Sequence, residues 1–207
     1  MRSLQKILQF SIAFIGWLAV VVQFYLMMQN RVATVPETII RFFSFFTILT
    51  NILVAISFTI LAIGKNASSY RFFSTTNVIT AITTYIFIVG LVYNTVLRSV
   101  WDPHGVQLYV DEALHVATPV LCLLYWFLFV PGRSLKWKDA IAWLLYPLIY
   151  LVYLLARGAV SNFYPYFFIN VDELGYSKVF VNAVYVTLVF LLVSLLMIWA
   201  GRSLKRN

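Results

Sequence analysis

Long apolar stretches, separated by short polar segments, recur along the whole chain. A helix that crosses a bilayer needs about 20 mostly apolar residues at a rise of about 1.5 Å each. The connections between the stretches are short, so the pattern predicts an all-α fold with one transmembrane domain over residues 1–207. Six stretches qualify as spans, near residues 7–28, 38–63, 75–98, 113–130, 138–157 and 178–201.

The first stretch begins with Arg2 and Lys6, as a secretory signal peptide does. Its apolar part is longer than that of a signal peptide, and no small-residue cleavage site follows it. We therefore expect this stretch to be retained as the first of six helices.

Composition agrees with a membrane protein and excludes several other classes. Hydrophobic residues make up 62% of the chain and charged residues 11%, which is far from the composition of a soluble domain. Cys122 is the only cysteine, so no intramolecular disulfide is possible. The two histidines have no metal-ligand spacing, and no nucleotide-binding or GxSxG motif occurs, so we expect no metal and no cofactor.

Basic residues predict the orientation, because they concentrate in cytoplasmic segments. Ten of the 15 basic residues fall on the side that holds both termini, and this side holds one of the seven acidic residues. We therefore expect both termini in the cytoplasm. The net charge of +8 mostly records this asymmetry and does not indicate a nucleic-acid partner. The ten are Arg2, Lys6, Lys65, Arg71, Arg133, Lys136, Lys138, Arg202, Lys205 and Arg206.

Polar side chains interrupt the second stretch, RFFSFFTILTNILVAI, at residues 44, 47, 50 and 51. With both termini inside, this span runs inward from Arg41, and Thr47 lies about 9 Å below it at helical rise. The fourth span also runs inward, and His115 lies about one turn, roughly 5 Å, below its start. The sequence thus predicts that Thr47 and His115 lie at similar depths in the outer half of the bundle.

Other strong hydrogen-bonding groups fall in the same outer half, whereas the inner half has mostly Ser and Thr, which bond their own helix carbonyls. The pattern predicts a polar cavity that opens outward. Each residue also has a structural interpretation, because polar groups in spans often join helices and long cations often reach the interface. The further cavity residues that we predict are Asn94, Arg98, Tyr150, Tyr153, Arg157, Asn182 and Tyr185.

His115 is the residue that a structural interpretation explains least well, because ionisable groups inside spans tend to mark reaction centres. Pro119, four residues later, has no N–H for the carbonyl of His115, so we expect a carbonyl without its helical partner and a bend. Asp111 lies one turn before His115, where its carboxylate could orient the imidazole.

Four segments carry a resemblance to a known family: FFSFFTILTNILVA, LVYNTVLR, LHVATPVLCLLYWFLFVP and ARGAVSNFYPYFFINVDELGY. Together they resemble small bacterial multispan membrane proteins that are distantly related to the androgen-induced membrane proteins. The latter are integral-membrane threonine hydrolases of fatty acid esters of hydroxy fatty acids. The resemblance implies a nucleophile at Thr47, in FFT, and its histidine partner at His115, in EALHVATP.

The implied chemistry is hydrolysis of a lipophilic ester through an acyl-threonine, in a protein of the bacterial cytoplasmic membrane. A neutral imidazole activates the hydroxyl, and hydrogen-bond donors stabilise the oxyanion. Asn51 and Asn94 are the candidate donors, and Thr50 or Ser44 could replace Thr47 as nucleophile. The expected partners are a fatty-acyl ester and membrane lipids.

Two other interpretations use the same polar residues. A non-enzymatic transporter or lipid-binding protein would need the outward cavity but no Thr–His pair. A purely structural membrane protein would use the polar residues only as helix contacts, which their concentration in one leaflet disfavours.

Overall fold

The computed structural model describes residues 2–65 and 67–204, and these residues form helices and no strand. Within these residues six helices are long and apolar enough to cross a membrane, which confirms the all-α fold and the predicted number of spans. Lys205 and Arg206, which the charge pattern places in the cytoplasmic tail, lie outside the described residues. The spans are Ser3–Gln29, Phe46–Ile63, Thr76–Leu97, Val106–Phe129, Asp139–Ser161 and Val171–Ser203.

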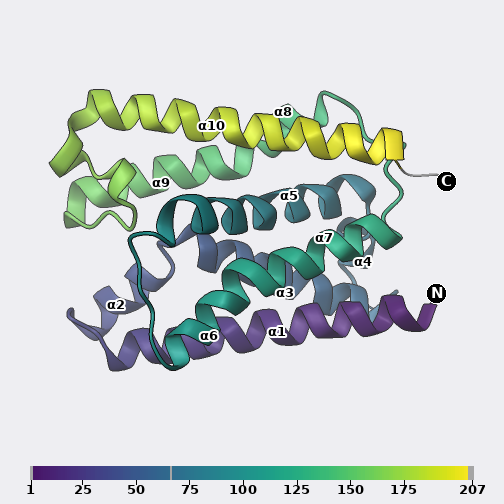
Figure 1. The fold of residues 1–207 in the computed structure, drawn as a ribbon, viewed down its shortest axis with the longest axis horizontal. Helices are drawn as coiled ribbons and strands as arrows, with labels where there is room; N and C mark the ends of the chain where they lie inside the picture. The colour runs from purple at the N-terminus through teal and green to yellow at the C-terminus, as the bar shows by residue number, and fades with distance from the viewer. Residues whose placement is uncertain (1, 66, 205–207) are drawn as a thin grey trace. The chain divides into compact units, whose positions relative to one another are not determined.

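The chain forms two compact units. Unit 1 comprises Met1–Leu135 and Ala200–Asn207, and unit 2 comprises Lys136–Trp199. Figure 1 follows both along the chain, from purple at the N-terminus to yellow at the C-terminus. Thr47, Asn51, Asn94, Arg98 and His115 belong to unit 1, and the other predicted cavity residues belong to unit 2.

Unit 1 is built on four long helical segments, and α1 packs along α3 while α5 packs along the segment that ends in α7 (Figure 1). Small residues allow the close approach of α1 and α3, because a Cβ on Gly16 would lie 3.2 Å from the Cβ of Ala55. Buried apolar side chains from α1, α2, α3 and α6 meet in one cluster beside His115. The elements are α1 (Arg2–Gln29), α2 (Val35–Phe42), α3 (Phe46–Ile63), α4 (Tyr70–Phe73), α5 (Thr76–Val92), η1 (Tyr93–Leu97), α6 (Val106–Glu112), η2 (Ala113–Ala117) and α7 (Thr118–Phe129).

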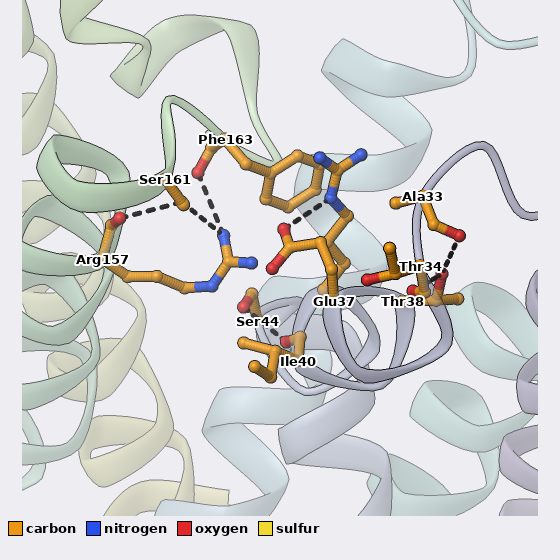
Figure 2. Close-up of polar contacts among 10 residues, drawn as sticks. Ala33, Thr34, Glu37, Thr38, Ile40, Ser44, Arg157, Ser161 and Phe163 are labelled. Carbon is orange, nitrogen blue, oxygen red and sulfur yellow. Dashed lines mark hydrogen bonds and ion pairs between the residues drawn. The ribbon is translucent and has the colours of Figure 1, made fainter.

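The predicted span at 38–63 was wrong as one continuous helix, because the chain leaves the helix between α2 and α3, at residues 43–45. Ser44 is fully buried there, and its Oγ donates to the carbonyl of Ile40 at 2.7 Å (Figure 2). A serine that bonds a nearby carbonyl offers the backbone an alternative to the helix. The break places Thr47 in the first turn of α3.

Other span ends also differ from the prediction. The fourth begins at Val106 rather than near 113, and the fifth is divided at Leu144 into α8 (Asp139–Trp143) and α9 (Leu145–Ser161). The sixth, α10 (Val171–Leu204), begins before 178 and contains a non-helical residue, Gly175, with φ 74°. Glycine adopts a positive φ without steric cost, so the backbone turns there.

Unit 2 contains α8, α9, the short 3₁₀ turn η3 (Phe167–Ile169) and α10 as far as Trp199. Leu154, Ile169 and Val179 form its buried centre. The ring of Tyr164 packs directly on Gly158, where a Cβ would lie only 2.0 Å from a ring carbon. The loop after α9 is therefore folded back onto the end of that helix.

The first and last described helices, α1 and α10, begin and end respectively at the same end of unit 1. Lys6 Nζ donates to the carbonyl of Ala62, near the end of α3, at 2.7 Å. Gln5 and Gln9 both donate to the hydroxyl of Tyr125, near the end of α7, at 3.1 and 2.8 Å. The chain after α7 contacts the C-terminal segment, where Arg202 donates to the carbonyl of Leu135 at 2.8 Å. That this end is cytoplasmic stays a prediction from charge.

Candidate functional site

His115 lies on η2, a π-helical turn between α6 and α7, and is 8% exposed. Its Nδ1 lies 2.9 Å from the backbone carbonyl of Asp111. A carbonyl oxygen only accepts, so the neutral ring carries its hydrogen on Nδ1, and Nε2 keeps a lone pair. The predicted orienting group was the Asp111 carboxylate, and the structure shows that the Asp111 backbone carbonyl makes this contact instead.

The imidazole is also held by an aromatic stack. The ring of Tyr93 lies parallel to the His115 ring, with centroids 3.8 Å apart and an interplanar angle of 11°. The guanidinium of Arg98 lies 5.4 Å from the centroid of the Tyr93 ring and forms an ion pair with Glu112. Arg98 thus contacts the residues around His115, Tyr93 and Glu112, rather than the imidazole itself.

Tyr93 belongs to η1, so the stack joins two π-helical turns on neighbouring segments. Such turns are rare and occur frequently at functional sites, because the extra residue in the turn displaces side chains and carbonyls from regular positions. The sequence predicts a bend near Pro119 but gives no signal for π turns. Tyr93 was missed as a site residue, although it adjoins the predicted Asn94.

Pro119 explains why carbonyls near His115 need partners from elsewhere. Proline has no N–H to donate. In an α-helical register the carbonyl of His115 therefore loses its helical donor, and in a π-helical register the carbonyl of Leu114 does. The N–H of Thr118 bonds the carbonyl of Ala113, five residues back, so the register is π-helical just before the proline.

Two asparagines donate to these two carbonyls. Asn94 Nδ2 lies 3.3 Å from the carbonyl oxygen of His115, and Asn51 Nδ2 lies 3.3 Å from that of Leu114. Each amide also donates to the carbonyl four residues before it, at 2.7 and 2.9 Å respectively. In either register, the carbonyl that Pro119 leaves without a helical donor therefore has a side-chain donor. Both amide groups serve helix packing in this conformation rather than an oxyanion.

Gly90 allows α5 to reach this point. A Cβ on Gly90 would lie 2.8 Å from the carbonyl oxygen of His115 and 3.1 Å from the ring of Pro119. Any larger residue would separate α5 from the turn that carries His115.

The three candidate hydroxyls of the second span differ in accessibility. Ser44 and Thr50 are both 0% exposed, whereas Thr47 is half-buried. Thr47 also lies in the first turn of α3, where backbone N–H groups have no acceptor within the helix. Thr47 is therefore the hydroxyl of the three that an incoming molecule reaches most directly.

Asn51 connects the segment that carries Thr47 with the segment that carries His115. Its amide bonds the backbone of Thr47 and of the residue before His115. Thr47 and His115 thus lie on neighbouring segments at the same level of unit 1. Within the described residues no hydrogen bond joins the Thr47 hydroxyl to the imidazole, so their direct pairing stays a prediction.

A polar network beside His115 was not predicted. The carboxylate of Asp111 is 5% exposed and accepts from Trp101 Nε1 at 2.7 Å and from Gln107 Nε2 at 3.1 Å. Gln107 also donates to Gln23 Oε1 at 2.7 Å. The four-residue spacing of Gln107 and Asp111 was the only sequence signal for this network. Among the described residues, no three His, Cys, Asp or Glu side chains are placed to hold a metal.

The predicted residues of unit 2 make contacts of their own. Arg157 donates to Ser161 Oγ at 3.1 Å and to the carbonyl of Phe163 at 3.3 Å (Figure 2). Asn182 donates to the carbonyl of Phe168 at 2.7 Å. Of the three tyrosines, Tyr150 packs against the buried centre of unit 2, whereas Tyr153 and Tyr185 are exposed. That these residues share one cavity with Asn94 and Arg98 stays a prediction.

Comparison with known proteins found no matching family model, no matching curated protein and no matching solved structure. The resemblance to the androgen-induced membrane proteins therefore stays an expectation from four short segments.

Proposed function

We propose that this protein is an integral-membrane hydrolase of lipophilic carboxylic esters, with Thr47 as nucleophile and His115 as general base. The observation that carries the proposal is the hydrogen bond from His115 Nδ1 to the Asp111 carbonyl, which leaves Nε2 as the proton acceptor. A buried base of this kind lies on a rare π turn, next to α3, whose first turn contains Thr47.

The reaction follows from these groups. His115 Nε2 takes the proton of the Thr47 hydroxyl while Oγ1 attacks the ester carbonyl carbon. The intermediate expels the alcohol, which receives the proton from the imidazolium, and an acyl-threonine remains. Water then attacks this ester and releases the fatty acid. His115 acts as base and acid in each half, which a fixed tautomer supports.

The oxyanion needs donors other than the asparagines, because their amide groups bond backbone carbonyls. The first turn of α3 supplies backbone N–H groups beside Thr47 itself, and the positive end of the helix dipole points the same way. We assign oxyanion stabilisation to these groups, because they act on charge that develops next to the nucleophile.

The substrate class that we propose is fatty acid esters of hydroxy fatty acids or similar acyl esters, as the resemblance implies. Such a molecule partitions into a bilayer at about 0.8 kcal/mol per buried CH₂, so it would reach the site sideways from the lipid. We place the site toward the outer leaflet of the bacterial cytoplasmic membrane, from the charge asymmetry and from the position of Thr47 in the first turn of α3.

A lipid-binding or transport protein is the second candidate, and one observation favours it. An apolar groove of about 430 Å³ lies between α9 and α10 within unit 2. Its lining includes Leu148, Leu151, Leu155, Phe180 and Leu188. A binding protein would use such a surface for acyl chains without needing Thr47 or His115.

Hydrolysis of a panel of acyl esters by the purified protein separates the two candidates. Thr47→Ala should abolish turnover, Thr47→Ser should retain part of it, and His115→Ala should lower the rate by about 10²–10⁴-fold. Thr50→Ala is the matched control and should keep its activity. If no ester is cleaved, or if the Thr47→Ala protein is as active as wild type, the hydrolase proposal fails.

A further inference from the structure

Two polar side-chain atoms of unit 1 are fully buried and have no protein partner within the described residues, Asn51 Oδ1 and Thr118 Oγ1. The orientation of the Asn51 amide is fixed, because its nitrogen donates to two carbonyl oxygens. A rotated amide would place its own oxygen against both. Asn51 Oδ1 is therefore an acceptor that needs a donor from outside the protein.

The two atoms lie at the same helix contact. Asn51 of α3 bonds the carbonyl of Leu114, and further along Phe58 of α3 packs edge-on against Tyr125 of α7, with centroids 5.0 Å apart. Thr118 is four residues after Leu114 and seven before Tyr125, so it shares their helix face, toward α3. Asn51 and Thr118 are thus separated by about one helical turn, roughly 5 Å along the axis.

Buried polar groups that lack a protein partner are usually bonded to ordered water, which needs at least two such groups. We propose that Asn51 Oδ1 and Thr118 Oγ1 hold one water molecule between α3 and α7, and that this water hydrolyses the acyl-threonine. Asn51 lies next to the residues that carry both reacting groups, because its amide bonds the backbone of Thr47 and of the residue before His115. The role of the water rests on the proposed function, whereas the site does not.

The second half of the reaction then balances with water alone. The water donates a hydrogen bond to Asn51 Oδ1 through one O–H, which it keeps. It transfers its other proton to His115 Nε2 as its oxygen bonds the acyl carbon. The bond between that carbon and Thr47 Oγ1 breaks, and the proton on Nε2 passes to Oγ1. The products are the carboxylic acid and the regenerated threonine.

The role is tested with p-nitrophenyl acyl esters, which report acylation as a burst and deacylation as the steady rate. Asn51→Leu should keep the burst, lower the steady rate by about tenfold or more, and accumulate acyl-threonine that intact-protein mass spectrometry detects. Asn94→Leu is the matched control, because Asn94 donates to the same turn in the same way but is exposed. It should not accumulate acyl-protein. Equal accumulation in both variants, or in neither, overturns the role of this water.

Thr118→Val provides a second variant of nearly unchanged shape, and it should also accumulate acyl-protein. Its control is Thr84→Val, because the Thr84 hydroxyl is equally buried but bonds the carbonyl of Thr80. Failure of the wild-type protein to cleave these esters at all contradicts the proposed function and leaves the site to a direct measurement. That measurement is a high-resolution experimental structure, in which water density should lie about 2.7–3.0 Å from Asn51 Oδ1. Density for other buried waters but none at this position overturns the site itself.

Discussion

Pro119 removes one N–H from the segment that carries His115, and asparagines on two other segments supply donors in its place. Asn94 reaches the carbonyl of His115 and Asn51 that of Leu114. The two amides supply hydrogen bonds that the helix backbone does not provide at the proline. A buried carbonyl without a donor would lower the stability of the fold. From the sequence alone, Asn51 and Asn94 were candidate oxyanion donors, because a sequence does not show which group an amide bonds.

At Gly90 the packing leaves no space for a side chain. Gly90→Ala should lower the free energy of unfolding by about 1–3 kcal/mol, because the added Cβ meets the carbonyl of His115 and the ring of Pro119. Thermal unfolding in detergent measures the change. Gly16→Ala is the control, because its added Cβ comes no nearer than 3.2 Å to its closest neighbour, the Cβ of Ala55, and it should cost less. A larger loss for Gly16→Ala would contradict the close packing at His115.

The buried carboxylate of Asp111 depends on its donors. Trp101→Phe keeps most of the ring but removes the hydrogen bond from Nε1. A hydrogen bond to a charged group contributes about 1.5–3 kcal/mol, so the variant should unfold at a lower temperature. Trp199→Phe is a suitable comparison, because Trp199 is exposed and distant in sequence. An equal effect of the two changes would argue against the Asp111 network.

At the scale of single elements, the sequence predicts long helices well and their interruptions poorly. Length and apolarity identify all six spans, but the break between α2 and α3 has neither glycine nor proline to mark it. It depends instead on buried Ser44 and on the packing of Phe42, which are tertiary effects. The two π turns are likewise settled by contacts between segments, such as the stack of Tyr93 on His115.

The link between Pro119 and Asn94 gives a prediction for the element that both stabilise. Asn94→Ala alone should lower the melting temperature, because the carbonyl of His115 loses its donor. In a Pro119→Ala background the turn can take an α-helical register, in which the new backbone N–H at 119 bonds that carbonyl, so the same change should cost less. A double-mutant cycle in detergent should give a coupling of about 0.5–3 kcal/mol. Additive effects would contradict the role of Asn94 as a substitute donor.

For the whole molecule, the chemistry depends on which side of the membrane the site faces. Reporter fusions after Arg133 and at the C-terminus should both report the cytoplasm, and a fusion at Gly105 should report the opposite side. The basis is the location of ten of the 15 basic residues on the side of the termini. A periplasmic signal at the C-terminus would reverse the orientation and move the site to the inner leaflet.

Part of the candidate site could also be predicted from the sequence. Matched depth and the family resemblance selected Thr47 and His115, and the structure has them on neighbouring segments, joined through Asn51. The sequence could not show that the Asp111 carbonyl rather than its carboxylate holds the imidazole, because four-residue spacing serves both contacts. It could not select among the three hydroxyls either, because burial of Ser44 and Thr50 depends on the fold.

The central claim is that Thr47 is a nucleophile activated by His115, and covalent labelling tests it most directly. A hydroxyl-directed fluorophosphonate with an alkyl chain should form one adduct, and peptide mass spectrometry should locate it on Thr47. Labelling should be lost in Thr47→Ala and strongly slowed in His115→Ala, while Thr50→Ala should label as wild type does. An adduct on another residue, or equal labelling of wild type and Thr47→Ala, would contradict the account.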